Sequence, residues 1–240
     1  YDIGKKFEII RFEIYDLELK VAKIKKMNFR KEIYAITNEN LSGMTHLEMA
    51  YLLLENGIKI IQYRDKEKIK KEKLKDCFEI KKLVDNYSDV TFIVNDDVDI
   101  AYLVNADGVH LGQDDLDIKI VKEKFPSFIV GISTHNIEQV ENAIKNGADY
   151  IGVGPIFNTN TKIGVEKSDG LKFLKWVKDN IEIPYVAIGG INRYNINDVF
   201  KYGGNTVAMI SELFTDEKIK EIKLEFIRRQ NDIYNSDGCS

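Results

Sequence analysis

The stretch FIVGISTHNIEQVENAIKNGADYIGVG, residues 128–154, decides the fold of this 240-residue chain. It opens with a nearly continuous apolar run, Phe128–Ser133, and closes with another, Tyr150–Gly154. Between the two runs, apolar residues recur at the spacing of one helix face and stop at Asn146-Gly147. Glycine just past a helix accepts the left-handed backbone that ends it, without steric cost. The stretch therefore predicts a strand, a helix and a second, parallel strand, with both strands covered on both faces.

The same unit repeats along the chain from about residue 32 onward, where short β-branched runs alternate with segments of helical period. The runs are Glu32–Thr37, Ile58–Arg64, Thr91–Asn95, Gly108–Gly112, Phe128–Ser133, Tyr150–Gly154, Tyr185–Gly190 and Thr206–Ser211. Eight strands alternating with helices are typical of a (β/α)8 barrel. A doubly wound open sheet is the alternative, but eight strands without a further domain favour closure. We predict an α/β chain that forms a single (β/α)8 TIM barrel over residues 32–232, with a short N-terminal extension of unknown role (1–31) and a loose tail (233–240).

Composition narrows the class of partner and the compartment. The net charge is -4, with Lys and Arg scattered among Asp and Glu, which argues against nucleic acid. No apolar run approaches the ~18 residues of a membrane span, so we expect no membrane partner. The two cysteines, Cys77 and Cys239, form neither a disulfide framework nor a metal-binding spacing. We therefore expect a cytoplasmic protein with small-molecule partners, and a homo-oligomer stays open.

Polar residues follow the second run, at the strand end where barrels place their chemistry. The sequence there is Gln62-Tyr63-Arg64-Asp65-Lys66. A period of two puts Gln62, Arg64 and Lys66 on one side of the chain. An amide and two cations that face inward suit a diphosphate. The alternative is a solvated strand end with ordinary charges.

Carboxylates follow the third and fourth runs. Asn95-Asp96-Asp97 ends the third run, and Gly112-Gln113-Asp114-Asp115 ends the fourth. Neighbouring strand ends converge, and like charges brought together call for a cation, so these residues predict a Mg²⁺ site. The alternative is that Asp114 or Asp115 caps a helix that begins at Leu116.

The remaining strand ends offer further anion ligands. Ser133 and Thr134 follow the fifth run and suit an anion, although we also expect a helix cap there, with Glu138 completing a capping box. The loop 154–162 after the sixth run is rich in hydroxyls, ends in Lys162 and is long enough to act as a lid. Gly189-Gly190, with the helix start after the eighth run, predicts a second, metal-free phosphate site. Two anion sites and a metal in one mouth indicate a transfer reaction in which pyrophosphate leaves.

These strand ends, in order over about residues 33–229, resemble the thiamine-phosphate synthase (thiamine-phosphate pyrophosphorylase) family. The motifs that carry the resemblance are QYRDK (62–66), VNDD (94–97), ADGVHLGQDD (106–115), GPIF (154–157), TxTK (159–162) and IGGI (188–191). The resemblance implies an enzyme that joins a hydroxymethylpyrimidine diphosphate to a thiazole phosphate and releases pyrophosphate with the help of Mg²⁺. The diphosphate departs first, and the thiazole nitrogen captures the pyrimidinylmethyl cation.

The resemblance also implies a role for individual residues. The residues that would bind the pyrimidine diphosphate are Gln62, Arg64, Lys66, Asn95, Ser133 and Lys162. The residues that would bind the thiazole phosphate are Thr159, Thr161, Gly190, Ile210 and Ser211. Asp96 and Asp115 would bind Mg²⁺, and Arg64, Ser133 and Lys162 would be catalytic.

Two other functions are weighed against this one. The first is the thiazole tautomerase branch of the same family, for which His135 would be the acid/base residue. The second is a non-catalytic barrel that senses or carries a phosphorylated metabolite. The complete Gln-x-Arg-x-Lys and paired-Asp set disfavours the tautomerase, and a metal site with a lysine-tipped loop exceeds what a sensor needs.

Overall fold

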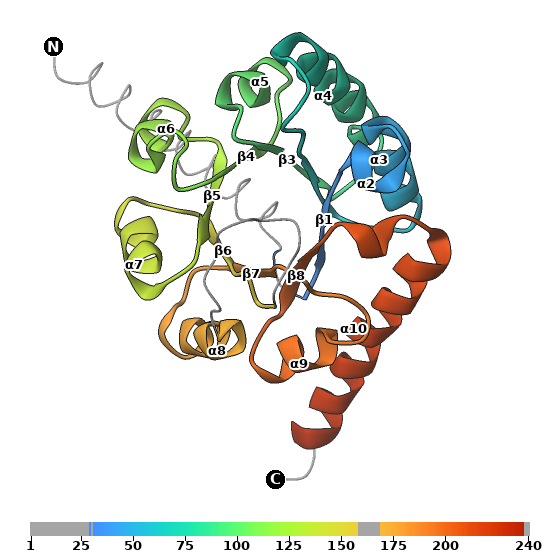
Figure 1. Cartoon of the computed structure of the whole chain (residues 1–240), viewed down its shortest axis with the longest axis vertical. Helices are drawn as coiled ribbons and strands as arrows, with labels where there is room; N and C mark the ends of the chain where they lie inside the picture. Colours follow the sequence, from blue (N-terminus) through green and yellow to red (C-terminus); the bar gives the residue numbers. More distant parts are fainter. Residues whose placement is uncertain (1–28, 30, 158–168, 238–240) are drawn as a thin grey trace, which may run out of the picture.

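The computed structural model describes residues 29, 31–157 and 169–237. Within them eight short strands alternate with helices, which surround the strands as an outer ring (Figure 1). The strands are β1 (Ile33–Ile36), β2 (Ile60–Tyr63), β3 (Thr91–Asn95), β4 (Gly108–Leu111), β5 (Ile129–Thr134), β6 (Tyr150–Val153), β7 (Tyr185–Ile188) and β8 (Thr206–Met209). The helices are α2 (Glu39–Ser42), α3 (His46–Glu55), α4 (Lys70–Val84), α5 (Val98–Leu103), α6 (Ile118–Lys124), α7 (Ile137–Lys145), α8 (Gly170–Asn180), α9 (Ile196–Lys201), η1 (Ser211–Leu213) and α10 (Asp216–Asp237).

The sheet closes on itself. Each strand pairs in parallel with the next, and β8 pairs with β1, with Tyr34 opposite Ala208. This arrangement confirms the predicted closed (β/α)8 barrel and rules out the open sheet. Each of the eight apolar runs coincides with a strand, and their ends differ by at most two residues.

The period of two along each strand sorts side chains between two cores. One core lies inside the barrel and contains Tyr34, Ile60, Ile93, Ile129 and Tyr150, among others. The other core lies between the strands and the helices and holds the intervening positions, such as Ala35, Ile61 and Val94. Gln62, Asn95 and Ser133 continue the inward-facing phase of their strands, so they lie towards the barrel mouth.

Aromatic side chains fill the barrel interior. The Phe29 ring lies 4.6 Å from the Tyr150 ring and 6.1 Å from the Tyr34 ring, centroid to centroid. The Phe29 carbonyl accepts a hydrogen bond from the Thr206 hydroxyl at the start of β8. Phe29 therefore closes the floor of the barrel, although the sequence assigned residues 1–31 to an extension. The rest of that segment, apart from Lys31, lies outside the described residues.

The C-terminal helix, α10, completes the outer layer of helices. Helix α10 continues to Asp237, past residue 233, at which the sequence placed the start of a tail. In the part of the chain that is described, no helix has both the length and the apolar character needed to cross a membrane.

Candidate active site

Three of the predicted ligands meet at the mouth of the barrel. The Lys66 ammonium donates a hydrogen bond to Asp96 Oδ2, and the Asp96 carboxyl in turn contacts that of Asp115. Lys66 follows β2, Asp96 follows β3 and Asp115 follows β4, so three neighbouring strands contribute one group each. The convergence that the sequence predicted for these carboxylates and this cation is therefore present.

The two carboxyls perturb each other. Burial raises the pKa of Asp96, and the carboxyl of Asp115 raises it further, while the Lys66 ammonium opposes both effects. Burial also acts to raise the pKa of Asp115, but hydrogen bonds from Asp96 and from the Gly112 N–H outweigh it and lower that pKa. Two carboxyl groups that perturb each other's pKa beside a single ammonium group fit a divalent cation, which would bind between them.

The backbone decides which of two adjacent aspartates enters the mouth. Asp96 has φ 60, in the left-handed region that is uncommon for a residue other than glycine. Its neighbour Asp97 instead pairs with Lys73 on α4, with 2.8 Å between Lys73 Nζ and Asp97 Oδ2. The turn at Asp96 therefore sends one carboxylate inward and the other towards the helix layer.

The expected helix caps near the site are wrong in position. Helix α6 begins at Ile118, not Leu116, and its cap is Asp117, whose side chain accepts from Lys119 N. Asp115 Oδ2 accepts from Gly112 N at 2.7 Å, which folds the carboxylate back over the end of β4. Neither Asp114 nor Asp115 caps the helix, because β4 is followed by a turn before α6 begins.

The cap after β5 also differs from the expectation. The strand runs to Thr134, whose hydroxyl donates to the Gly152 carbonyl. Asn136 caps α7 by accepting from Gln139 N, so Glu138 completes no capping box. Ser133 is consequently free of a capping duty and remains at the inner edge of the strand.

A partly buried hydrogen-bonded row that the sequence did not predict joins two of the expected ligands across the barrel. Gln62 Nε2 donates to the Tyr34 hydroxyl at 2.8 Å, and the Tyr34 and Tyr150 hydroxyls are 2.8 Å apart. His110 contacts Tyr150 through Nδ1 at 2.9 Å and Ser133 Oγ through Nε2 at 3.0 Å. We call this set, Gln62, Tyr34, Tyr150, His110 and Ser133, the interior polar row.

The row connects two strand ends on opposite sides of the barrel mouth. Burial raises the pKa of the Tyr34 and Tyr150 phenols, so both keep their protons. Gln62 Nε2 donates at one end of the row, and at the other end Ser133 Oγ lies within hydrogen-bond distance of His110 Nε2. The row therefore fixes the side chains of Gln62 and Ser133, which the sequence predicted as diphosphate ligands. The inward phase of Tyr34, His110 and Tyr150 is visible in the sequence, but the pairing of Tyr34 with Tyr150, 116 residues apart, has no local signature.

The other predicted residues take the following places. Arg64 and Asn95 are half-buried at the ends of β2 and β3, and Gln62 is buried. Gly190 and Ile210 are half-buried and Ser211 is exposed, at the ends of β7 and β8. Gly189 and Gly190 have φ of 105 and 63, in the region that favours glycine, and a Cβ on Gly189 would come within 2.7 Å of Pro155 Cα. Thr159, Thr161 and Lys162 lie outside the described residues.

The residue on which the tautomerase alternative depends is engaged elsewhere. His135 Nδ1 lies 2.5 Å from the Gly154 carbonyl, and the His135 N–H donates to Gln139 Oε1 at 2.7 Å. Nδ1 must carry a proton to donate to a carbonyl, so this histidine ties the ends of β5 and β6 together.

Comparison with known sequences matches most of this chain to one family. The family model described as thiamine monophosphate synthase matches residues 33–213. A thiamine-phosphate synthase of Lawsonia intracellularis is 48% identical over 190 residues, covering 78% of this chain and 87% of the relative. One from Caldicellulosiruptor saccharolyticus is 44% identical over 191 residues, covering 79% and 86%.

Comparison with solved structures gives the same family. A thiamine phosphate pyrophosphorylase from Pyrococcus furiosus superposes with a TM-score of 0.75 at 34% identity, over 82% of this chain and 96% of that one. A barrel described as native KDPGal, at 14% identity and a TM-score of 0.60, shares the fold alone. On the family match and these relatives, the chain belongs to the thiamine monophosphate synthase family.

Proposed function

We propose that this chain is a transferase that condenses a hydroxymethylpyrimidine diphosphate with a thiazole phosphate, giving thiamine phosphate and pyrophosphate. Membership of the family supports the reaction. The observation that carries the proposal is the meeting of Lys66, Asp96 and Asp115 at one mouth, where a diphosphate and a divalent cation would both find ligands.

The proposal assigns the strand ends to two substrates. The pyrimidine diphosphate would bind to Gln62, Arg64, Lys66, Asn95, Ser133 and Lys162. The thiazole phosphate would bind to Thr159, Thr161, Gly190, Ile210 and Ser211. The left-handed glycines after β7 support the second assignment, because they let the backbone approach phosphate oxygens closely.

Asp96 and Asp115 are the residues that would hold Mg²⁺. The cation, when bound, would neutralise charge on the departing diphosphate. The fit rests on the chemistry of the pair: two carboxyl groups that perturb each other's pKa, with the backbone of Asp96 in the left-handed region so that its side chain enters the mouth. Lys66, already paired with Asp96, would then turn to the phosphate oxygens.

The chemical step breaks the bond between the pyrimidine methylene carbon and the bridging oxygen, and the electron pair leaves with the diphosphate. The thiazole nitrogen then donates its lone pair to the methylene carbon. Arg64, Lys66 and Lys162 stabilise the growing negative charge, and the Ser133 hydroxyl, which lies beside His110 Nε2, would hydrogen-bond to the departing diphosphate. No side-chain nucleophile takes part, so catalysis comes from charge stabilisation and from alignment of the two rings.

The free, buried thiol of Cys77 supports a reducing compartment, and we therefore place the protein in the cytoplasm.

Incubating the purified protein with both substrates, with and without EDTA, tests the proposed reaction. We expect pyrophosphate and thiamine phosphate in equal amounts and a loss of both on chelation. Failure to release pyrophosphate from the two substrates with Mg²⁺ present would refute the function.

A further inference from the structure

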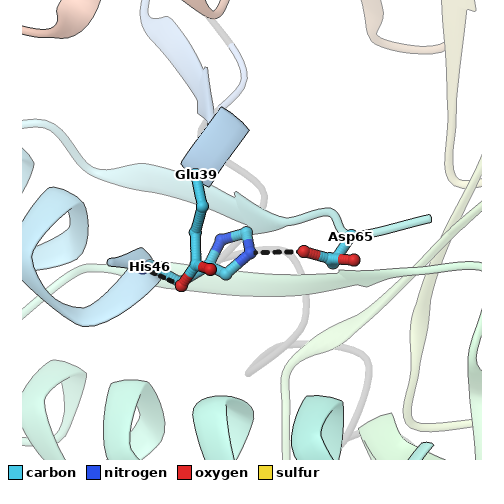
Figure 2. A group of neighbouring side chains, drawn as sticks. All are labelled: Glu39, His46 and Asp65. Atoms are coloured by element: carbon cyan, nitrogen blue, oxygen red, sulfur yellow. Dashed lines mark hydrogen bonds and ion pairs between the residues drawn. The ribbon is translucent and has the colours of Figure 1, made fainter. Parts of the chain in front are cut away.

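A second polar group lies beside the proposed diphosphate site. Glu39 belongs to α2, His46 is the first residue of α3, and Asp65 follows β2 (Figure 2). The potential ligand atoms of these three residues all lie within 4.8 Å of one another. A histidine between two carboxylates is a common metal-binding set, so the group has to be tested as a metal site first.

The contacts of this group argue against a metal. The Lys68 ammonium already lies 2.8 Å from Glu39 Oε1 and 2.6 Å from Asp76 Oδ2, so a cation is in place. Both ring nitrogens of His46 are engaged: Nδ1 lies 2.6 Å from Thr37 Oγ1, and Nε2 lies 3.1 Å from Asp65 Oδ2. A divalent ion would have to displace the lysine and break the histidine contacts.

His46 is held rigidly. Its side chain is fully buried, and its ring packs on Tyr63 with 4.4 Å between centroids. The preceding residue, Thr45, forms a capping box with Glu48, which fixes the start of α3. Thr37, whose hydroxyl contacts Nδ1 of His46, is itself anchored to β2, because its N–H donates to the Gln62 carbonyl.

Asp65 transmits this rigidity to the segment after β2. Its Oδ1 accepts from the backbone N–H groups of Glu67 at 2.8 Å and Lys68 at 2.7 Å, while its Oδ2 faces His46. Burial acts to raise the pKa of Asp65, but hydrogen bonds from the Lys68 N–H and His46 outweigh it and lower the pKa, so the carboxylate stays ionised. Arg64 and Lys66 flank this fixed residue in the sequence.

We propose that His46 is a positioning residue for the diphosphate site: through Asp65 it fixes the backbone from which Arg64 and Lys66 reach the diphosphate. The inference rests on the proposed function, because a rigid segment at this position matters only if Arg64 and Lys66 bind a diphosphate. The His46 side chain is fully buried and acts on the site only through Asp65. Loss of its contact would loosen Arg64 and Lys66 without removing either charge, and misplacement by about 1 Å is enough to cost roughly a hundredfold in rate.

The test is His46→Leu, compared with His46→Gln and Tyr63→Phe. For His46→Leu we expect the KM for the pyrimidine diphosphate to rise at least ~10-fold, while the KM for the thiazole phosphate stays within ~2-fold. His46→Gln, whose amide can donate to Asp65, should recover part of the loss. Tyr63→Phe is the matched control: it removes the bond from Tyr63 to Asp76 next to the same ring but leaves Asp65 untouched.

A binding measurement separates this inference from the proposed function. Titration of pyrophosphate with Mg²⁺ into wild type, Arg64→Ala and His46→Leu should give weaker binding in both variants. Weakened binding in Arg64→Ala but unchanged binding in His46→Leu would overturn the positioning role alone. Absence of binding and of turnover in wild type would overturn the proposed function and the inference with it. If His46→Leu lacks a cooperative melt, Asp65→Ala, which removes the oxygen that accepts from the N–H groups of Glu67 and Lys68, is judged by the same criteria.

Discussion

The substitution Gly131→Ala tests how tightly the barrel interior holds the site. A Cβ on residue 131 would lie 2.1 Å from Cζ of Tyr150, and 2.3 and 2.6 Å from its two Cε atoms. The ring would have to move by roughly 1.4 Å to reach an ordinary carbon contact of ~3.5 Å. Its hydroxyl bonds to Tyr34 and His110, at 2.8 and 2.9 Å, cannot both survive such a shift.

The expected cost has two parts. Overpacking a filled interior costs about 1–3 kcal/mol. A buried hydroxyl that loses its partners costs about 1–3 kcal/mol more. For a domain of this size each kcal/mol lowers Tm by roughly 2–4 °C, so the sum of about 2–6 kcal/mol predicts a drop of about 4–24 °C. Because the interior polar row ends at Ser133, kcat should fall as well.

Thermal melts followed by circular dichroism measure the effect. Gly131→Ala combined with Tyr150→Leu removes the clash, so the double variant should be less destabilised than the two single effects added together. Tyr150→Phe keeps the ring and removes only the hydroxyl, which separates lost hydrogen bonds from the clash. A melt of Gly131→Ala within about 1 °C of wild type would refute the packing described for the interior.

Three other predictions concern charge and metal. Lys162→Ala should lower kcat ~10-fold or more with little change in the KM for thiazole phosphate; unchanged pyrophosphate release would contradict its role at the leaving group. Asp115→Ala should abolish stimulation by Mg²⁺ while Asp114→Ala keeps it, and equal damage from both, in a magnesium titration of the rate, would show that the ligand is wrongly assigned. In metal-free protein, the raised pKa of Asp96 gives stability that is full below its unfolded pKa of ~3.9 and is lost as pH rises through the folded pKa. The Tm of Asp96→Asn should therefore exceed that of wild type by a margin that grows from about pH 4 to 7 in EDTA, and a margin that shrinks would contradict the raised pKa of Asp96.

The fold and the inward-facing ligands could be predicted because they depend on period alone. Buried strands show as apolar runs, and alternation from Ile60 places Gln62 on the interior face. The same logic explains the meeting of Lys66 with Asp96, since consecutive parallel strands end side by side.

The features that could not be predicted from the sequence depend on turn conformations and on contacts between residues far apart in the chain. Asp96 and Asp97 are chemically identical in the sequence, and only a left-handed turn sends the first inward. The caps at Asp117 and Asn136 were misplaced because the turn after β4 and the last residue of β5 move each helix start by one to three residues. Tyr34 and Tyr150 are brought together by barrel closure, which no local pattern encodes.

The central claim is that Asp96 and Asp115 hold the metal that accompanies the diphosphate. A crystal structure with Mn²⁺ in place of Mg²⁺ and with pyrophosphate, using the anomalous signal of the ion, tests it most directly. We predict one peak between the two carboxylates, with pyrophosphate oxygens on the ion and on Arg64 and Lys66. An ion bound instead among Glu39, His46 and Asp65, with Asp96 and Asp115 uncoordinated, would contradict the account.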